Sequence, residues 1–271
     1  MKIADWLREA TGLLEGSGIG TARLDALVLL EGVSGKDRAW LLAHPDSKLS
    51  PEQGVELKKL LKRRSAHEPL AYVRGKSEFY GREFIVNNNV LEPRPESETM
   101  IDLLKRLPDL PSPLYLSDIG CGSGALGITA ALEFPKAHVE LLEIDAKALK
   151  VARINVDKFT LRIPALKSNL LSGSKYNSGV LLCNLPYVPD TYSINTSAGH
   201  EPKIAIFGGP DGLDLYRKLF EQAKDRLQKS LYILTESLPF QHNDLTTIAE
   251  SAGYELSEAE DFIQVFRHPK I

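Results

Sequence analysis

Short apolar segments alternate with segments of helical periodicity through residues 96–271. The apolar segments are residues 114–120 (LYLSDIG), 138–144 (HVELLEI), 179–184 (GVLLCN) and 230–236 (SLYILTE). Apolar residues recur at helical spacing in ALGITAALEF, after the first segment, and in AKALKVARINV, after the second. Such alternation is typical of an α/β domain in which helices cover a mostly parallel sheet. Because ligands of these sheets bind at the carboxyl ends of the strands, functional residues are expected there.

Two segments of different character precede this domain. In residues 1–68 the apolar residues recur at helical spacing, and Ser50 followed by Pro51 is typical of a helix N-cap and first helical position. We therefore interpret this segment as a small helical bundle. Residues 69–95 are rich in aromatic, β-branched and turn-forming residues, which predicts an extended linker with a β-hairpin. The basic run KKLLKRR at 58–64 is interpreted as a solvated helix face, with a docking patch for an acidic or RNA partner as the alternative.

The composition argues against several classes of protein. The 271 residues carry a formal net charge of −3, so stable binding of nucleic acid through its phosphates is not expected. No apolar run approaches the roughly 20 residues that cross a bilayer, and an N-terminus with Asp5 and Glu9 is typical of neither a secretory signal nor a transit peptide. Cys121 and Cys183 are expected to be reduced thiols that act as apolar filler in a cytoplasmic protein. The histidines show no ligand spacing, so no metal is expected.

The first predicted strand ends in DIGCGSG, residues 118–124, directly before a predicted helix. Glycines at 120, 122 and 124 let the backbone turn sharply and let a ligand approach where a Cβ would clash, which suits a nucleoside or nucleotide. A dinucleotide fold would instead have the spacing G-x-G-x-x-G, which delivers a pyrophosphate to the helix N-terminus. A tight structural turn is the alternative explanation.

The second predicted strand ends beside two carboxylates, Glu143 and Asp145. An acidic side chain at this place accepts both hydroxyls of a ribose. The alternative is that they cap the following helix, which we expect of Asp145 more than of Glu143.

The glycine loop, the acid after the second strand and the sequence Asn-Leu-Pro-Tyr at 184–187 together resemble Rossmann-like S-adenosylmethionine-dependent methyltransferases that act on amino groups. The resemblance implies a mostly parallel seven-stranded sheet, S-adenosyl-L-methionine as cofactor and S-adenosyl-L-homocysteine as product. It places Glu143 at the ribose, and it places Asn169, where the family usually has Asp, at the adenine amino group; an amide oxygen accepts the same hydrogen bond without charge assistance. The implied cofactor-binding residues are Asp118, Gly120, Cys121, Gly122, Gly124, Glu143, Ile144, Asn169, Leu170 and Asn184.

The same resemblance gives the segment 184–187 a chemical role. The lone pair of an amide or aromatic amine is delocalised, so the site must orient the nitrogen toward the cofactor methyl group. The Asn184 oxygen accepts one N–H in this hypothesis, and the main-chain carbonyl of Leu185 or Pro186 accepts the other. Pro186 fixes the backbone, and Tyr187 offers its ring to a planar substrate. Asn184, Pro186 and Tyr187 are therefore the predicted catalytic residues, and the alternative is a strand-ending turn.

Several longer segments resemble the HemK/PrmC family, which methylates the glutamine of the Gly-Gly-Gln motif in peptide-chain release factors. These are EPLAYVRGKSEFYGREFIV, VLEPRPESE and EPKIAIFGGPDGLDLYRKLF. The resemblance implies that residues 1–68 dock the substrate, that 69–95 form the linker and that 96–271 form the methyltransferase domain of a monomer. It implies that the release factor is the partner; that no membrane is involved is expected from the lack of a long apolar run. The implied substrate-binding residues are Arg94, Glu96, Asn184, Leu185, Pro186, Tyr187, Glu201 and Pro202.

The chain departs from the HemK/PrmC pattern in several places, one of which is a short substrate loop between Asp190 and Glu201. Position 185 is Leu, where the family usually has Pro, and the usual Glu-His-Gly after the fifth strand is replaced by ESLPFQ. Leu at this position also occurs in adenine methyltransferases, so an N6-adenine methyltransferase for DNA or RNA stays open as the second hypothesis, and an inactive cofactor-binding adaptor as the third. For Arg94 and Glu96, a surface ion pair is the alternative to a site role. For GGPDGLDLYR the alternative to a role beside the substrate loop is a turn and helix start capped by Asp211 or Asp214.

Overall fold

The computed structural model describes the chain apart from residues 226–229 and 270–271, which fall inside the predicted 96–271 domain. No helix among the described residues is long and apolar enough to span a membrane. The chain forms two compact units, which are Met1–Lys76 with Asn195–His200, and Ser77–Ile194 with Glu201–Ile271.

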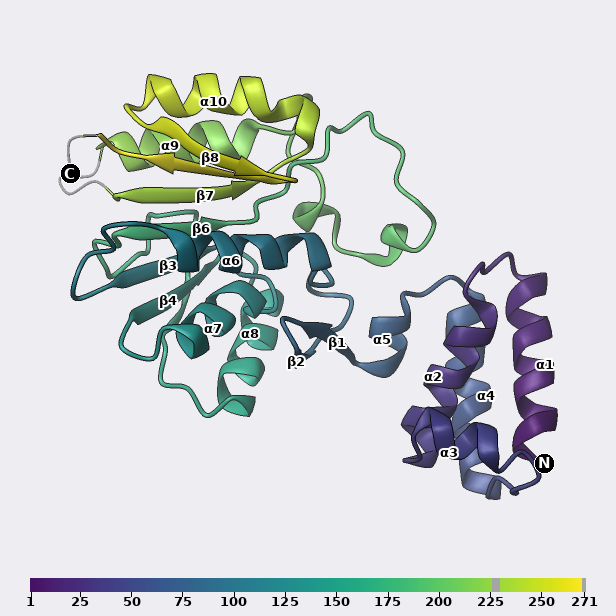
Figure 1. Ribbon diagram of the computed structural model, residues 1–271. Helices are drawn as coiled ribbons and strands as arrows, with labels where there is room; N and C mark the ends of the chain where they lie inside the picture. Colours follow the sequence, from purple (N-terminus) through teal and green to yellow (C-terminus); the bar gives the residue numbers. More distant parts are fainter. Residues whose placement is uncertain (226–229, 270–271) are drawn as a thin grey trace. The chain divides into compact units, whose positions relative to one another are not determined.

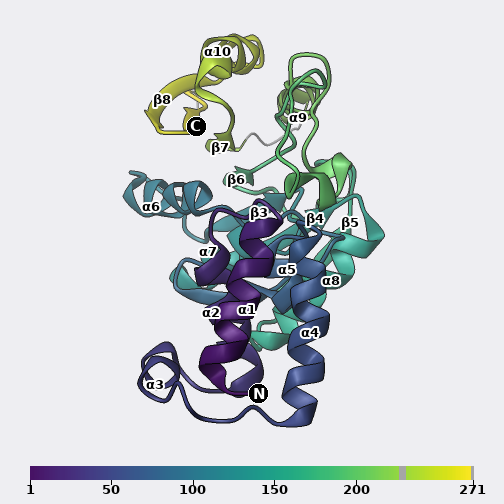
Figure 2. The same ribbon diagram turned by 90° about the vertical axis from the view of Figure 1, so that its right-hand side faces the viewer.

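The first unit contains the helices predicted for the N-terminal residues. They are α1 (Ile3–Gly16), α2 (Ala22–Ser34), α3 (Arg38–Ala43), α4 (Pro51–Ser65) and α5 (Leu70–Arg74) (Figure 2). Leu14, Leu30 and Leu57, from three of these helices, are fully buried in one apolar cluster. Ser50 caps α4 as predicted, because its Oγ accepts the Gln53 N–H while Gln53 Oε1 accepts the Ser50 N–H.

The basic run on α4 is not wholly solvated, and the prediction was wrong for its last residue. Lys58 and Lys62 are exposed, but Arg64 follows Leu57 by seven residues and therefore lies on the same apolar helix face. Arg64 Nε donates to Asp25 Oδ2 of α2 at 2.7 Å, and the two side chains are only 10% and 5% exposed. Seven consecutive residues of a helix span about two turns, so they cannot all lie on the solvent face. Arg64 therefore lies on the buried face, where it pairs with Asp25.

The predicted hairpin is confirmed as a two-stranded sheet of β1 (Lys76–Phe79) and β2 (Arg82–Ile85). The prediction of extended chain through all of 69–95 was wrong for α5. Its residues include Leu and Ala, which favour a helix, and three of the five, Ala71 to Val73, are buried. Burial of these side chains outweighs the turn-forming residues around them.

A seven-stranded, mostly parallel sheet forms the centre of the second unit, as predicted (Figure 1). The strands run in the order β5-β4-β3-β6-β7-β9-β8, and the pairs β7–β9 and β9–β8 are antiparallel. From β3 the chain builds outward to β4 and β5, and then returns to β6 on the other side of β3. The strands are β3 (Tyr115–Ile119), β4 (His138–Glu143), β5 (Ala165–Lys167), β6 (Val180–Cys183), β7 (Tyr232–Glu236), β8 (Glu255–Glu260) and β9 (Ile263–Arg267).

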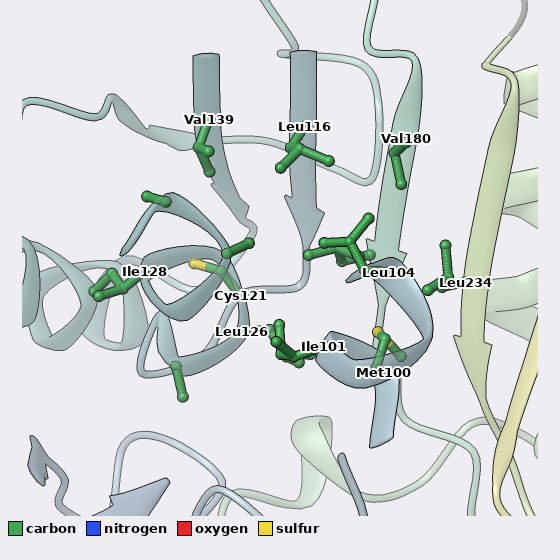
Figure 3. Close-up of a cluster of buried hydrophobic side chains, with 14 of the residues drawn as sticks. Met100, Ile101, Leu104, Leu116, Cys121, Leu126, Ile128, Val139, Val180 and Leu234 are labelled. Atoms are coloured by element: carbon green, nitrogen blue, oxygen red, sulfur yellow. The ribbon is translucent and has the colours of Figure 1, made fainter. Parts of the chain in front are cut away.

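Apolar side chains are buried on both faces of this sheet, because successive residues of a strand point to opposite faces. Leu116, Val180 and Leu234 belong to a cluster that includes residues of α6, α7 and α8 (Figure 3). Ile119 and Leu181 belong to a second cluster, with residues of α9 and α10. The predicted helices after the first two strands are thus confirmed as α7 and α8. The helices of this unit are α6 (Glu98–Arg106), α7 (Ala125–Glu133), α8 (Ala146–Lys158), α9 (Asp214–Asp225) and α10 (His242–Ser251).

We expect Arg64→Met to lower the free energy of unfolding of the first unit by about 3–5 kcal/mol, because it leaves the buried Asp25 carboxylate without its partner. Both tryptophans of the chain, Trp6 and Trp40, lie in this unit, so urea unfolding followed by tryptophan fluorescence reports on it alone. Lys62→Met, on an exposed position of the same helix, is the control and should change the unfolding free energy by less than about 0.5 kcal/mol. Equal effects of the two substitutions would contradict the role of the pair.

Candidate active site

A cavity lies at the carboxyl ends of β3, β4 and β6, where the strand order reverses on either side of β3. All of its lining residues belong to the second unit. Of the predicted site residues, Gly124, Glu96, Tyr187 and Glu201 are absent from the lining that the described residues form. Those present are Arg94, Asp118, Gly120, Cys121, Gly122, Glu143, Ile144, Asn169, Leu170, Asn184, Leu185, Pro186 and Pro202.

The glycine loop after β3 is tied to the neighbouring strand. The N–H groups of Gly120 and Cys121 both donate to the Leu142 carbonyl, at 2.8 and 3.1 Å. A Cβ at Gly122 would meet no atom within 4 Å, so main chain borders open space at this point of the cavity. Gly124 instead serves packing, because a Cβ there would lie 3.0 to 3.2 Å from side chains of α7 and β4. The missing side chain therefore leaves space for a ligand at Gly122, and at Gly124 it leaves space for the neighbouring side chains of α7 and β4.

Glu143 joins the glycine loop to the end of β4. Its carboxylate accepts the N–H groups of Gly122 and Asp145, each at 2.9 Å. Burial raises the pKa of Glu143, and these main-chain hydrogen bonds oppose the rise. Asp145 caps α8 as predicted, because its Oδ1 accepts the N–H groups of Lys147 and Ala148. A carboxylate has about four acceptor positions, so Glu143 retains capacity for ligand hydroxyls.

Asp118 lies beneath the loop and is 1% exposed. Its Oδ2 accepts the Gly127 N–H at 2.8 Å. Burial raises the pKa of Asp118 to about 7, against the lowering effect of the Gly127 hydrogen bond, and the charge of Glu143 adds to the rise. Asp118 is therefore a neutral acid over part of the physiological range.

Asn169 is exposed at the cavity edge, in a loop that Ser168 holds. The buried Ser168 hydroxyl donates to the Leu170 carbonyl at 2.6 Å and accepts the Gly173 N–H at 2.8 Å. This leaves the Asn169 side chain open to a ligand while its backbone is fixed.

Asn184 stands at the end of β6, in contact with residues that the sequence did not single out. Its Nδ2 donates to Ser97 Oγ at 2.9 Å, and Ser97 Oγ donates to Glu236 Oε2 at 2.5 Å. The Tyr187 hydroxyl donates to the other oxygen, Glu236 Oε1, at 3.0 Å. Glu236 is the last residue of the predicted strand 230–236, which pairs with the strand before Asn184. Its place at a strand end is the feature of the sequence from which it could have been identified as a candidate site residue.

A buried tyrosine from GGPDGLDLYR holds β6 and β7 together where they end. The Tyr216 hydroxyl oxygen lies 3.3 Å from the N–H nitrogens of Leu185 and Glu236, 3.0 Å from the Cys183 carbonyl and 2.5 Å from the Glu236 carbonyl. Leu185 thus has a partner for an N–H that the family's usual proline lacks. This tyrosine was not assigned a role from sequence.

The same segment packs against the main chain that follows Asn184. A Cβ at Gly208 would lie 2.2 Å from the Pro186 carbonyl oxygen, so no side chain fits there. Gln241 Nε2 donates to the carbonyls of Tyr187 and Asp211 at 2.8 and 2.7 Å. The Asp211 side chain accepts the Leu213 N–H just before α9 begins, which agrees with the interpretation of this segment as a turn and helix start. The segment 236–241, which departs from the family pattern, thus supports the turn through Gln241.

Arg94 pairs with a residue distant in sequence. Its Nη2 donates to both oxygens of Glu201 at 2.7 Å, and the Glu201 side chain is 2% exposed. Burial raises the pKa of Glu201, and Arg94 lowers it. Because Arg94 and Pro202 both line the cavity, this ion pair ties two parts of its wall together, whereas Glu96 is exposed and outside it.

Cys121 and Cys183 are buried, and burial raises the pKa of both thiols well above their usual value. A protonated thiol inside an apolar cluster behaves as a small hydrophobe, in agreement with the prediction.

Comparison with known proteins identifies the family. Residues 5–75 match the model of the PrmC N-terminal domain, and residues 99–201 match that of the methyltransferase small domain. The release factor glutamine methyltransferase of Coxiella burnetii is 32% identical to this chain, and the match covers 91% of the chain and 90% of the relative. The chain belongs to the release factor glutamine methyltransferase family. A second relative of that name, from Rhodopirellula baltica, is 34% identical over 93% of the chain and 88% of its own length.

A further relative and two solved structures are methyltransferases as well. A bifunctional methyltransferase of Rickettsia felis is 32% identical, but the chain covers only 55% of that protein. Among solved structures, a methyltransferase from Pyrococcus furiosus has a TM-score of 0.52 at 16% identity, covering 81% of this chain and 99% of that one. The T. thermophilus 16S rRNA N2 G1207 methyltransferase, in complex with AdoMet and guanosine, has a TM-score of 0.51 at 17% identity, covering 71% and 49%. These structures confirm the Rossmann-like methyltransferase fold.

The raised pKa of Asp118 predicts a pH dependence of stability in this methyltransferase. Between its usual value of 3.8 and about 7, the folded protein holds a proton that the unfolded chain has released, so stability falls as pH rises through this window. The loss from pH 4 to pH 8 should be on the order of a few kcal/mol, and Asp118→Asn should lack this contribution. Urea unfolding followed by far-UV circular dichroism measures both.

Asp157→Asn, at an exposed position of α8, is the control and should keep the wild-type dependence. If Asp118→Asn keeps it as well, the Asp118 carboxyl is ionised throughout the window and the assignment is wrong.

Proposed function

We propose that this methyltransferase transfers the methyl group of S-adenosyl-L-methionine to the side-chain amide nitrogen (N5) of the glutamine in the Gly-Gly-Gln motif of peptide-chain release factors. The observation that carries the proposal is that one cavity is lined both by the glycine loop with Glu143 and by the carboxamide of Asn184. A cofactor site and an amide-orienting site therefore meet within a single space.

The residues of the cavity fit the cofactor. Main chain borders open space at Gly122, and Glu143 retains acceptor capacity beside it, as a ribose requires. Asn169 and Leu170 would hold the adenine at the loop that Ser168 fixes. S-adenosyl-L-methionine supplies a methyl group on a positively charged sulfur, which makes this carbon electrophilic.

The protein's contribution to the reaction is to orient the glutamine nitrogen. Two acceptors are needed for its two N–H groups, and Asn184 Oδ1 is the first. For the second we propose the Leu185 carbonyl, because the Pro186 oxygen lies against the main chain of Gly208. With both N–H bonds held, the nitrogen lone pair is directed to the methyl group, and positioning of this kind can lower a barrier by roughly 7–11 kcal/mol. Transfer would form the nitrogen–carbon bond as the carbon–sulfur bond breaks, with S-adenosyl-L-homocysteine as the leaving group. The methylated nitrogen would then be cationic and acidic and would release one proton to water, so no strong base is required.

Family membership favours the release factor over the other substrates. Relatives that cover most of the chain are named release factor glutamine methyltransferases, and none of the described residues that line the cavity favours adenine or an inactive adaptor. We further propose that the first unit docks the body of the release factor and that the protein acts in the cytoplasm as a monomer.

A methyl-transfer assay with radiolabelled S-adenosyl-L-methionine tests this function. The substrates are a purified release factor, the same factor with Gly-Gly-Gln changed to Gly-Gly-Ala, and bulk nucleic acid. We expect label on the unchanged factor only. Label on nucleic acid, or on the factor that lacks the glutamine, would refute the proposal.

Two single substitutions should separate orientation of the substrate from binding of the cofactor. Asn184→Ala should lower kcat by roughly 100-fold, because the nitrogen is no longer held in line, and leave the cofactor Kd within about threefold of wild type. Glu143→Gln should do the opposite and weaken the cofactor Kd by roughly tenfold or more, since an amide has one acceptor oxygen instead of two. Steady-state kinetics and calorimetry give the two quantities, and parallel losses of both in either variant would contradict these roles.

A further inference from the structure

The buried carboxylate of Glu236 has no part in the mechanism above, although it is hydrogen-bonded to Ser97, the partner of Asn184. Glu236 is 1% exposed at the end of β7, which pairs with β6 up to the residue before Asn184. It accepts hydrogen bonds from two hydroxyls, Ser97 at 2.5 Å and Tyr187 at 3.0 Å. A buried charge is costly, so one held at this place by two donors calls for an explanation.

The single hydroxyl proton of Ser97 determines which end of the Asn184 amide faces Ser97. The Ser97 hydroxyl has one proton, and it is donated to the Glu236 carboxylate. Ser97 can therefore meet Asn184 only as an acceptor, which requires the NH2 end of the amide, and the 2.9 Å contact is to Nδ2. The carbonyl end is then left for the substrate.

Without an ionised carboxylate this selection is lost. The Ser97 proton would be free to point at Asn184, and Ser97 would accept or donate equally well. The amide flipped by 180° would then be as stable as the observed one. A flipped Asn184 would present NH2 to the NH2 group of the substrate, and two donors do not bond.

The second hydrogen bond to the Glu236 carboxylate restrains Tyr187. Its hydroxyl donates to Glu236 Oε1 while its ring packs at the edge of a buried apolar cluster. One carboxylate thus restrains both Asn184, through Ser97, and the aromatic residue three positions further along the chain.

We propose that Glu236 is a positioning residue for methyl transfer, which selects the amide orientation of Asn184 through Ser97 and restrains Tyr187 directly. The inference rests on the proposed function, because it concerns the orientation of the same substrate nitrogen. Burial raises the pKa of Glu236, and the side-chain interactions with Ser97, Tyr187 and Asn184 oppose that rise and favour the charged form.

The test compares Glu236→Gln and Ser97→Ala with a control of similar structural cost. Glu236→Gln keeps the shape but adds two N–H donors, so the Ser97 proton is no longer committed. The control is Ser117→Ala, because Ser117 is a buried serine of β3 that donates to buried Glu140 at 2.6 Å outside the cavity. For each protein kcat and KM are measured with the release factor, together with the Kd of S-adenosyl-L-homocysteine and the thermal midpoint.

We expect kcat to fall roughly 100-fold in Glu236→Gln and in Ser97→Ala, with the Kd of S-adenosyl-L-homocysteine within about twofold of wild type. Ser117→Ala should keep kcat within about twofold of wild type even though its thermal midpoint falls by a similar amount. Because both residues act through one amide orientation, the double variant should be no slower than the slower single variant. If Glu236→Gln does not fold, Ser97→Ala with its control carries the same comparison.

The inference is overturned if kcat of the variants matches that of Ser117→Ala, if the Kd weakens in parallel with kcat, or if the two losses multiply in the double variant. The proposed function is tested separately, by the wild-type enzyme: if it methylates the release factor, the function holds even when the inference about Glu236 fails. A wild-type enzyme that transfers no methyl group to the factor would remove both proposals.

Discussion

The site depends on the separation of β3 and β6 at their carboxyl ends. From β3 the chain leaves toward β4, and from β6 it leaves toward β7, so the segments after these paired strands diverge. Divergence deprives main-chain groups of their sheet partners, and each must be satisfied in another way. The Leu142 carbonyl takes two N–H groups of the glycine loop, and the Tyr216 hydroxyl serves the ends of β6 and β7. The cavity is the space that remains between two ends fixed in this manner.

Carboxylates near this cavity are held by main-chain N–H groups and hydroxyls. Asp118 accepts one N–H, Glu143 accepts two, and Glu236 accepts two hydroxyl protons. An ion pair would consume the acceptor capacity and add another charge, whereas these neutral donors define the orientation of each carboxyl group and add no charge of their own. A negative environment suits a cofactor whose sulfur is positively charged. Arg94 is the exception, and its charge is matched by Glu201.

The sequence predicted what depends on short-range patterns. The positions of β3, β4, β6 and β7, and of α7 and α8, followed from periodicity, whereas β5, β8 and β9 were not located. The caps at Ser50 and Asp145 followed from residues within three positions of each other. It did not predict α5, where burial overrides the surrounding turn formers, or the pairing of Arg64 inside a basic run. Both depend on which helix face meets the core, and that is decided by residues distant in the chain.

Among the candidate site residues, the same distinction holds. Asn184 and Glu143 stand at strand ends that a pattern identifies, and their roles toward substrate and cofactor stay proposals. Ser97 could not be found in this way, because it lies 87 positions from Asn184 and 139 from Glu236. A serine before a helix is ordinary, and only the fold places it between an amide and a carboxylate.

The most direct test of the central claim is a crystal structure with S-adenosyl-L-homocysteine and a peptide that contains Gly-Gly-Gln. We predict that the glutamine nitrogen lies within about 3 Å of both Asn184 Oδ1 and the Leu185 carbonyl oxygen. A glutamine bound elsewhere, or an Asn184 that turns its nitrogen to the substrate, would contradict the account.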